Sequence, residues 1–127
     1  MKEIITTSDA PGAIGPYSQG VKANGFVFVS GQLPIDPATG DFPSGGIEEQ
    51  TKQSLENITA ILRRVGCGLQ DVVKTTVFLS DMKDFTAMNK VYAAYFHEDC
   101  PGRSAVQVAQ LPKNAMVEIE AIACISD

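Results

Sequence analysis

Apolar residues follow two periods along the chain. Period-two runs predict strands at 4–5, 17–22, 26–30, 72–79, 103–109 and 116–123, and helical spacing predicts helices over 48–65 and 84–97. Asn24-Gly25 is a strong hairpin signal between two of these strands. The run 26–30 is apolar throughout, which is typical of a strand in the middle of a sheet. The predicted order is β-β-β-α-β-α-β-β.

The first helix carries an inward apolar stripe of Leu55, Ile58, Leu62 and Val65, and Gly66 is a natural stop. The two strand–helix–strand passages suit right-handed crossovers, which place both helices on one face of the sheet. We therefore expect an α+β, two-layer fold: a six-stranded mixed sheet with two helices on one face.

Alternate residues of the final strand form two rows, one on each face of the sheet, and the rows differ in polarity. The row that begins at Val117 is wholly apolar and is assigned beneath the helices, whereas the row that begins at Glu118 mixes charge with apolar bulk. The second face then has no partner inside the chain, so we predict that bare faces pack together in a closed homo-oligomer.

A hairpin about Pro112-Lys113 would pair the last two strands. It brings Gln107 near Glu118 and Arg103 near Ile122. Ile122 lies four residues beyond Glu118, a distance of about 13 Å along the strand. Arg103 and Glu118 would then converge only if neighbouring subunits share each pocket.

Composition narrows the functional classes. The chain has 127 residues, enough for one domain spanning 1–127, and its 44% apolar and 20% charged residues describe an ordinary globular protein. The net charge of −5 and scattered basic residues argue against nucleic-acid binding. No apolar run is long enough for a membrane helix and the start has no signal pattern, so we expect a cytoplasmic protein.

The cysteines Cys67, Cys100 and Cys124 are widely spaced and odd in number, which favours reduced thiols over disulfides or a zinc site. His97 is the only histidine, so no metal site is expected.

Arg103 and Glu118 are the strongest candidates for chemistry, and period two puts each on the less apolar face of its strand. A guanidinium can hold a carboxylate through two parallel hydrogen bonds, and a carboxylate can orient or deprotonate a water. The pair suggests a pocket for a small organic acid that undergoes hydrolysis. The alternatives are a structural ion pair for Arg103 and an interface carboxylate for Glu118.

Several motifs, in order along nearly the whole chain, resemble the RidA family, also called YjgF/YER057c/UK114. They are IGPYSQG at 14–20, VSGQ at 29–32, VKTTVFL at 73–79, MNKVY at 88–92, PGRS at 101–104, LPK at 111–113 and VEIEAIA at 117–123. The resemblance implies a chorismate-mutase-like fold and a homotrimer with ligand pockets at subunit interfaces. It also implies 2-iminobutanoate/2-iminopropanoate deaminase activity without metal or organic cofactor.

The resemblance also implies roles for individual residues. Arg103 matches the arginine that binds the substrate carboxylate, and Glu118 matches the acid that positions the hydrolytic water. Tyr17 would join them as a catalytic residue, offering a hydroxyl for orientation or proton relay. Further substrate-binding positions are Ser30, Gly31 and Asn89. Local hydrogen bonding is the alternative role for Tyr17, Ser30 and Asn89.

Three positions depart from common members of this family. Ala105 stands where many have cysteine, so thiol-dependent properties of relatives do not transfer to this chain. Gln107 and Gln110 replace Glu and Arg, which puts the substrate range in question.

Two other functions compete with imine hydrolysis. One is a regulator that binds 2-oxo acids without turnover, which a pocket arginine suits equally well. The other is an endoribonuclease or translation inhibitor, against which the acidic charge and the single histidine count.

Overall fold

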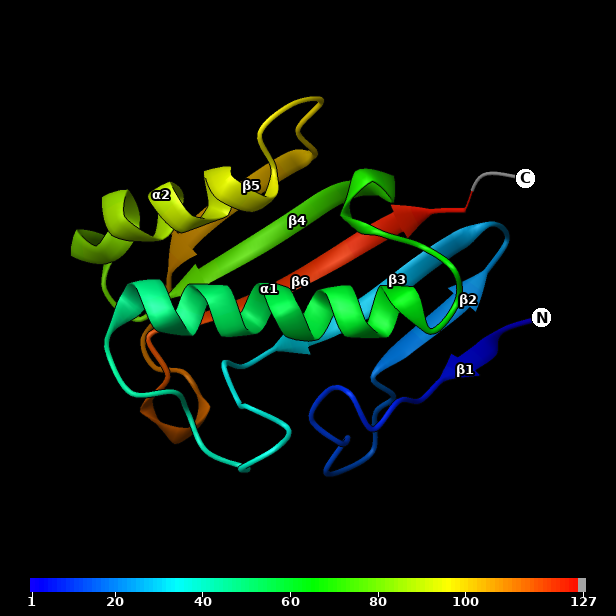
Figure 1. Cartoon of the computed structure of the whole chain (residues 1–127), viewed down its shortest axis with the longest axis horizontal. Coiled ribbons are helices and arrows are strands. Elements are labelled where there is room, and N and C mark those ends of the chain that lie inside the picture. Colours follow the sequence, from blue (N-terminus) through cyan, green and yellow to red (C-terminus); the bar gives the residue numbers. More distant parts are fainter. Residues whose placement is uncertain (126–127) are drawn as a thin grey trace.

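The computed structural model describes residues 1–125. Six strands form one sheet in the order β1-β2-β3-β6-β4-β5, and two helices lie across it (Figure 1). The elements are β1 (Glu3–Ile5), β2 (Gly20–Ala23), β3 (Phe26–Gln32), α1 (Ile47–Arg63), β4 (Val72–Leu79), α2 (Phe85–Tyr95), β5 (Gly102–Gln107) and β6 (Val117–Cys124). The predicted order and the two-layer α+β class are confirmed.

The last two strands do not form the predicted hairpin. β6 lies between β3 and β4 and is antiparallel to both, whereas β5 runs parallel to β4 at the edge of the sheet. Arg103 therefore pairs with Thr75, and Glu118 pairs with Phe78. The wholly apolar inner row of β6 explains its central position, because a strand flanked on both sides buries that row completely.

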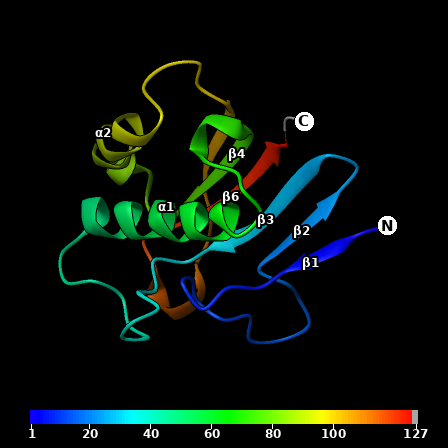
Figure 2. The same cartoon turned by 45° about the vertical axis from the view of Figure 1, so that its right-hand side comes forward.

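Both helices cover the same face of the sheet, as Figures 1 and 2 show from two directions. Leu55, Ile58 and Leu62 of α1 are fully buried against the strands. α1 ends two residues before the predicted limit, at Arg63. Gly66 follows in a left-handed conformation (φ 77°), and the Cys67 N–H closes the end by donating to Leu62 O at 3.0 Å.

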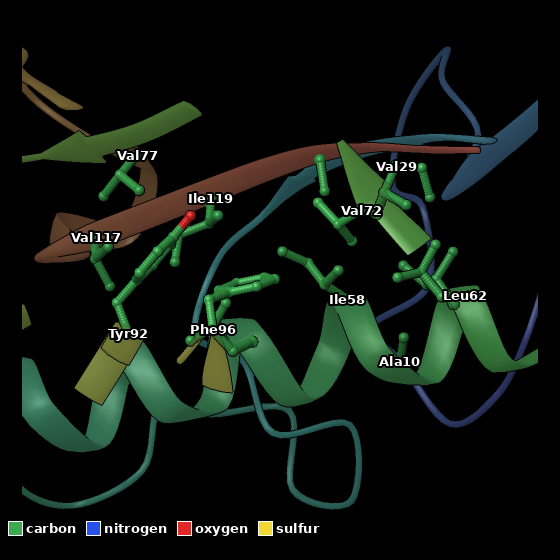
Figure 3. Packing of buried hydrophobic residues seen from close by; sticks show 14 of the residues in the cluster. Ala10, Val29, Ile58, Leu62, Val72, Val77, Tyr92, Phe96, Val117 and Ile119 are labelled. Atoms are coloured by element: carbon green, nitrogen blue, oxygen red, sulfur yellow. The ribbon is translucent and has the colours of Figure 1, made fainter. Parts of the chain in front are cut away.

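The core lies between the helices and the inner face of the sheet (Figure 3). Val117, Ile119, Ala121 and Ala123 of β6 are all buried there, which confirms the assignment of this row beneath the helices. Burying a side chain such as Ile119 is worth about 1.5–3 kcal/mol, so this one strand contributes substantially to stability. α2 adds the aromatic ring of Tyr92, seen at the left of Figure 3.

The outer face of the sheet is covered by neither helix. Phe26, Phe28 and Val106 are 42%, 44% and 43% exposed, and Ile122 between them is half-buried. β3 is central as predicted, but only its inner row is buried. The Asn24-Gly25 hairpin is confirmed, with both residues at positive φ (52° and 80°). In the described part of the chain no helix is both long and apolar enough to cross a membrane.

Three connecting segments, 6–19, 33–46 and 108–116, gather at one end of the sheet (Figures 1 and 2). Buried amides fix two of them. The Gln19 amide accepts from Thr7 N at 2.7 Å and donates to Thr7 O and Pro11 O at 3.0 and 2.8 Å. The Asn57 amide, from α1, donates to Leu33 O and Ile35 O at 3.2 and 2.9 Å. Such satisfied buried groups hold the loops in defined positions.

Candidate functional site

Arg103 lies on β5 and reaches toward α2. Its guanidinium carbon is 4.7 Å from the centre of the Tyr92 ring and 5.5 Å from that of Phe85. One guanidinium nitrogen, Nη1, donates to Asn89 Oδ1 at 2.6 Å. No carboxylate of residues 1–125 forms an ion pair with Arg103, so the structural ion-pair alternative is not supported there. The guanidinium is held in place while most of its five N–H donors remain available.

We call Arg103, Asn89, Phe85 and Tyr92 the arginine cluster. Phe85, Asn89 and Tyr92 recur at i, i+4 and i+7, so they occupy one face of α2. The sequence predicts Asn89 as a substrate-binding position, with local hydrogen bonding as the alternative, and predicts no part in the site for Phe85 and Tyr92. The sequence signal that could have linked these residues to Arg103 is their spacing along one face of a helix that is followed by a strand carrying an arginine.

A buried hydrogen bond to β4 holds the Tyr92 side chain in position. Its hydroxyl and Thr75 Oγ1 are 2.7 Å apart in the buried interior. Burial raises the pKa of Tyr92, and the Thr75 hydrogen bond and the Arg103 charge oppose that rise. The ring therefore stays neutral and presents its face to the guanidinium.

Glu118 lies on the outer face of β6, against the backbone of Gly31. A β-carbon at Gly31 would overlap the Glu118 carboxylate, so only glycine leaves room for it there. Burial, and secondly the charge of Glu120, raise the pKa of Glu118. A half-buried carboxylate with a raised pKa is a stronger base than an exposed one, as general base catalysis requires.

Tyr17 and Ser30 are close to Gly31, the residue that the Glu118 carboxylate approaches: Ser30 precedes Gly31 on β3, and Tyr17 shares a cavity with it. Tyr17 and Gly31 line one cavity of about 340 Å³, and the Tyr17 ring is 54% exposed. Ser30 Oγ donates to Ser18 O at 2.6 Å, so its oxygen can accept from a ligand but its proton is committed. We call Glu118, Gly31, Tyr17 and Ser30 the glutamate cluster.

The two clusters do not meet within one chain. Arg103 pairs with buried Thr75 and faces α2, so the expectation that it lies on the less apolar, uncovered face is wrong. Glu118 alternates with buried Val117 and Ile119 and therefore faces the opposite side. The sequence pattern was misleading because β5 is an edge strand with few large apolar residues on either face.

The positions that depart from the family pattern lie on β5 and just beyond it. Ala105 packs against the core, where it offers no thiol. Gln107 Oε1 accepts from Met82 N at 2.7 Å, a bond to the turn before α2. Gln110 Nε2 donates to Asn114 Oδ1 at 3.4 Å, in the turn before β6.

The three cysteines belong to neither cluster. Cys67 is buried, and burial raises the pKa of its thiol, whereas Cys100 and Cys124 are exposed; all three are unpaired. Within residues 1–125 no group of three or more His, Cys, Asp or Glu side chains gathers in a way that could hold a metal ion.

Comparison with known proteins identifies relatives over nearly the whole chain. A RutC family protein of Pyrococcus horikoshii is 58% identical over 123 residues, 97% of this chain and 98% of that protein. The human 2-iminobutanoate/2-iminopropanoate deaminase is 48% identical, over 97% of this chain and 90% of that protein. A crystal structure from Thermotoga maritima matches with a TM-score of 0.96 and 53% identity, over 100% of both chains.

The family model described as Endoribonuclease L-PSP matches residues 7–125. That range contains both the arginine cluster and the glutamate cluster. The chain therefore belongs to this family, which is the RidA (YjgF/YER057c/UK114) family that its motifs resemble.

Proposed function

We propose that this protein hydrolyses 2-imino acids, such as 2-iminobutanoate and 2-iminopropanoate, to 2-oxo acids and ammonia. The observation that carries the proposal is Arg103, a guanidinium stacked on aromatic faces with no carboxylate partner among residues 1–125. A small carboxylate can bind it bidentately, because Asn89 uses only one nitrogen. Relatives about 50% identical are named for this activity.

The reaction needs little from the protein beyond positioning and proton transfer. Glu118 takes a proton from a water as the water oxygen bonds to the imine carbon. That proton passes to the imine nitrogen, which gives a carbinolamine. The hydroxyl proton then moves to the amino nitrogen, the carbon–nitrogen bond breaks, and ammonia leaves as the carbonyl forms. No electrons are gained or lost overall. General acid–base help of this kind is worth about 10²–10⁴-fold.

Tyr17 and Ser30 would orient the reactants. The Tyr17 hydroxyl accepts weakly from Ile14 N at 3.4 Å and can turn toward a ligand in the cavity it shares with Gly31. Ser30 Oγ can accept from the imine or the water, since its own proton is given to Ser18 O. Gly31 leaves the room that the Glu118 carboxylate occupies.

We further propose that each site forms between two copies of the chain, within a homotrimer. The arginine cluster and the glutamate cluster face opposite sides of one sheet, so neither can complete the other in the same chain. The exposed rings of Phe26 and Phe28 on the uncovered face give neighbouring copies an apolar surface to bury.

A coupled assay tests the function. Threonine dehydratase generates 2-iminobutanoate in the presence of semicarbazide, which traps imine that has not been hydrolysed. We expect the protein to divert imine to 2-oxobutanoate, and the Arg103→Ala variant to lose this effect. Binding of 2-oxobutanoate without faster imine loss would contradict the proposal and favour the regulator. RNA cleavage that disappears in Arg103→Ala would favour the ribonuclease.

A further inference from the structure

The cavity beside Gly31 continues into a second, larger one. The first has a volume of about 340 Å³ and the second about 490 Å³. Five residues line both, so the two are neighbouring parts of one hollow: Pro11, Gly12, Ile14, Ile35 and Lys113. Together they provide much more space than the four carbons of 2-iminobutanoate need.

The walls of this hollow are fixed rather than loose. The buried Gln19 amide holds the segment from Thr7 to Pro11 through three of its hydrogen bonds. The buried Asn57 amide holds the facing segment at Leu33 and Ile35. The larger cavity is therefore a built part of the fold, positioned before any ligand arrives.

Lys113 brings the one basic side chain to this hollow. It lines both cavities and a third, smaller one beside Asp41 and Phe42. Its backbone is left-handed (φ 58°), and so is that of Asn114 (φ 57°). Hydrogen bonds from Asn114 N to Leu111 O (3.2 Å) and from Ala115 N to Pro112 O (3.1 Å) hold this turn. A long residue in an unfavoured conformation at a cavity suggests a function for its side chain.

The ammonium has no acidic partner in the part of the chain that the structure describes. The ion pairs there join Lys83 to Asp81 and Lys90 to Glu48. Ile14 and Ile35 make the path from Gly31 to Lys113 apolar on its sides. A ligand in this hollow can therefore contact methyl groups and a positive charge at once.

We propose that Lys113 forms a second anion subsite, which selects 2-imino and 2-oxo acids whose side chain ends in a carboxylate. This inference rests on the proposed function for the placement of the reacting end near Gly31 and Glu118. The side chain then runs along the apolar wall, and its terminal carboxylate accepts hydrogen bonds from the Lys113 ammonium. An ammonium that has no ion-pair partner in residues 1–125 and lies near the apolar side chains of Ile14 and Ile35 suits a carboxylate.

Isothermal titration calorimetry on the full chain tests this subsite with 2-oxoglutarate and 2-oxopentanoate, five-carbon acids that differ by the terminal carboxylate. Because Lys113 is exposed to solvent, we expect a modest preference for 2-oxoglutarate, about three- to tenfold in Kd. Lys113→Met should abolish that preference, and Lys113→Arg should retain it. Lys52→Met, which removes one positive charge from an exposed site on α1, should also retain it.

Equal affinities in the unaltered protein would overturn the subsite, as would a preference that survives Lys113→Met. The outcome is independent of catalysis. If the imine assay fails while the Lys113-dependent preference is found, the proposed function falls and the subsite stands. If imines are hydrolysed but no preference exists, only the subsite falls.

Discussion

Arg103 and Glu118 project from opposite faces of the same sheet. They are also out of line along it, because Arg103 pairs with Thr75 of β4 and Glu118 with Phe78, three residues further on. Arg103 lacks an acidic partner in residues 1–125, and Glu118 has a raised pKa. A ligand that touches both must lie between two copies of the chain.

Replacing Arg103 by lysine keeps the charge but removes the planar guanidinium, which lies over the Tyr92 and Phe85 rings and could hold a carboxylate through two hydrogen bonds. We expect kcat/KM for 2-iminobutanoate to fall by about 100-fold or more. Arg63→Lys, at the exposed end of α1, is the matched control and should leave activity unchanged. Activity of Arg103→Lys near that of the unaltered protein would refute the bidentate role.

Gly31→Ala should displace the Glu118 carboxylate, because the new methyl group would occupy its position. We expect kcat/KM to fall more than about tenfold. The free energy of unfolding should change by less than about 1 kcal/mol, since the side chain that must move is flexible. Gly46→Ala, which meets open space, is the control for both measurements. An unfolding loss without an activity loss would show that Glu118 is structural.

The pH dependence of activity should report Glu118. Burial and the Glu120 charge raise its pKa above the ordinary 4.5, so the base is lost as pH falls through that raised value. Glu120→Gln removes the second cause, and the acid limb of the kcat/KM profile should move to lower pH. Glu3→Gln, on the exposed part of β1, should not move it. If the acid limb of the profile lies at the same pH in Glu120→Gln as in the unaltered protein, that result would argue against Glu118 as the base.

The raised pKa of Glu118 also makes the free energy of unfolding depend on pH, in a direction that can be stated. Because the folded state binds the Glu118 proton more tightly than the unfolded state, the folded state gains stability from it below the unfolded pKa. That gain is lost as pH rises through the folded pKa. Glu118→Gln should remove this part of the pH dependence of unfolding, measured at one protein concentration.

Tyr92→Phe keeps the ring beneath Arg103 but leaves the Thr75 hydroxyl buried without its partner. We expect a loss of about 1–3 kcal/mol in denaturant unfolding and only a small change in kcat/KM. Adding Thr75→Val should recover part of the stability, because it removes the orphaned hydroxyl. Tyr95→Phe loses a surface hydrogen bond to Glu56 and should cost less than about 0.5 kcal/mol. Equal losses at both tyrosines would contradict this account.

Much of the fold follows from periodicity along the chain. The helical stripe at Leu55, Ile58 and Leu62 and the inner row of β6 were predicted because burial imposes a strict period on them. The pairing of β5 with β4 was not predicted. Proximity in sequence favours a hairpin between β5 and β6, and no local pattern shows that β6 gains more by lying between β3 and β4.

The candidate residues could be named from motifs, and the separation of Arg103 from Glu118 within one chain was expected, although from a hairpin that does not form. Arg103, Asn89, Gly31 and Glu118 were named from motifs, yet the side of the sheet that Arg103 faces depends on the partner strand, which its own alternation does not reveal. The stacking of Arg103 on Phe85 and Tyr92 was missed for the same reason. Lys113 was noticed only as part of a motif, because its place at a cavity depends on loops distant in sequence.

Co-assembly of two inactive variants tests the shared site most directly. Arg103→Ala lacks one cluster and Glu118→Ala lacks the other, so a mixed oligomer can contain sites that combine an intact arginine cluster with an intact glutamate cluster. With random mixing of equal amounts, about a quarter of the sites should be whole, and about that share of activity should return. If the two variants, unfolded together and refolded as mixed oligomers, regain no imine hydrolysis, the site does not form between copies.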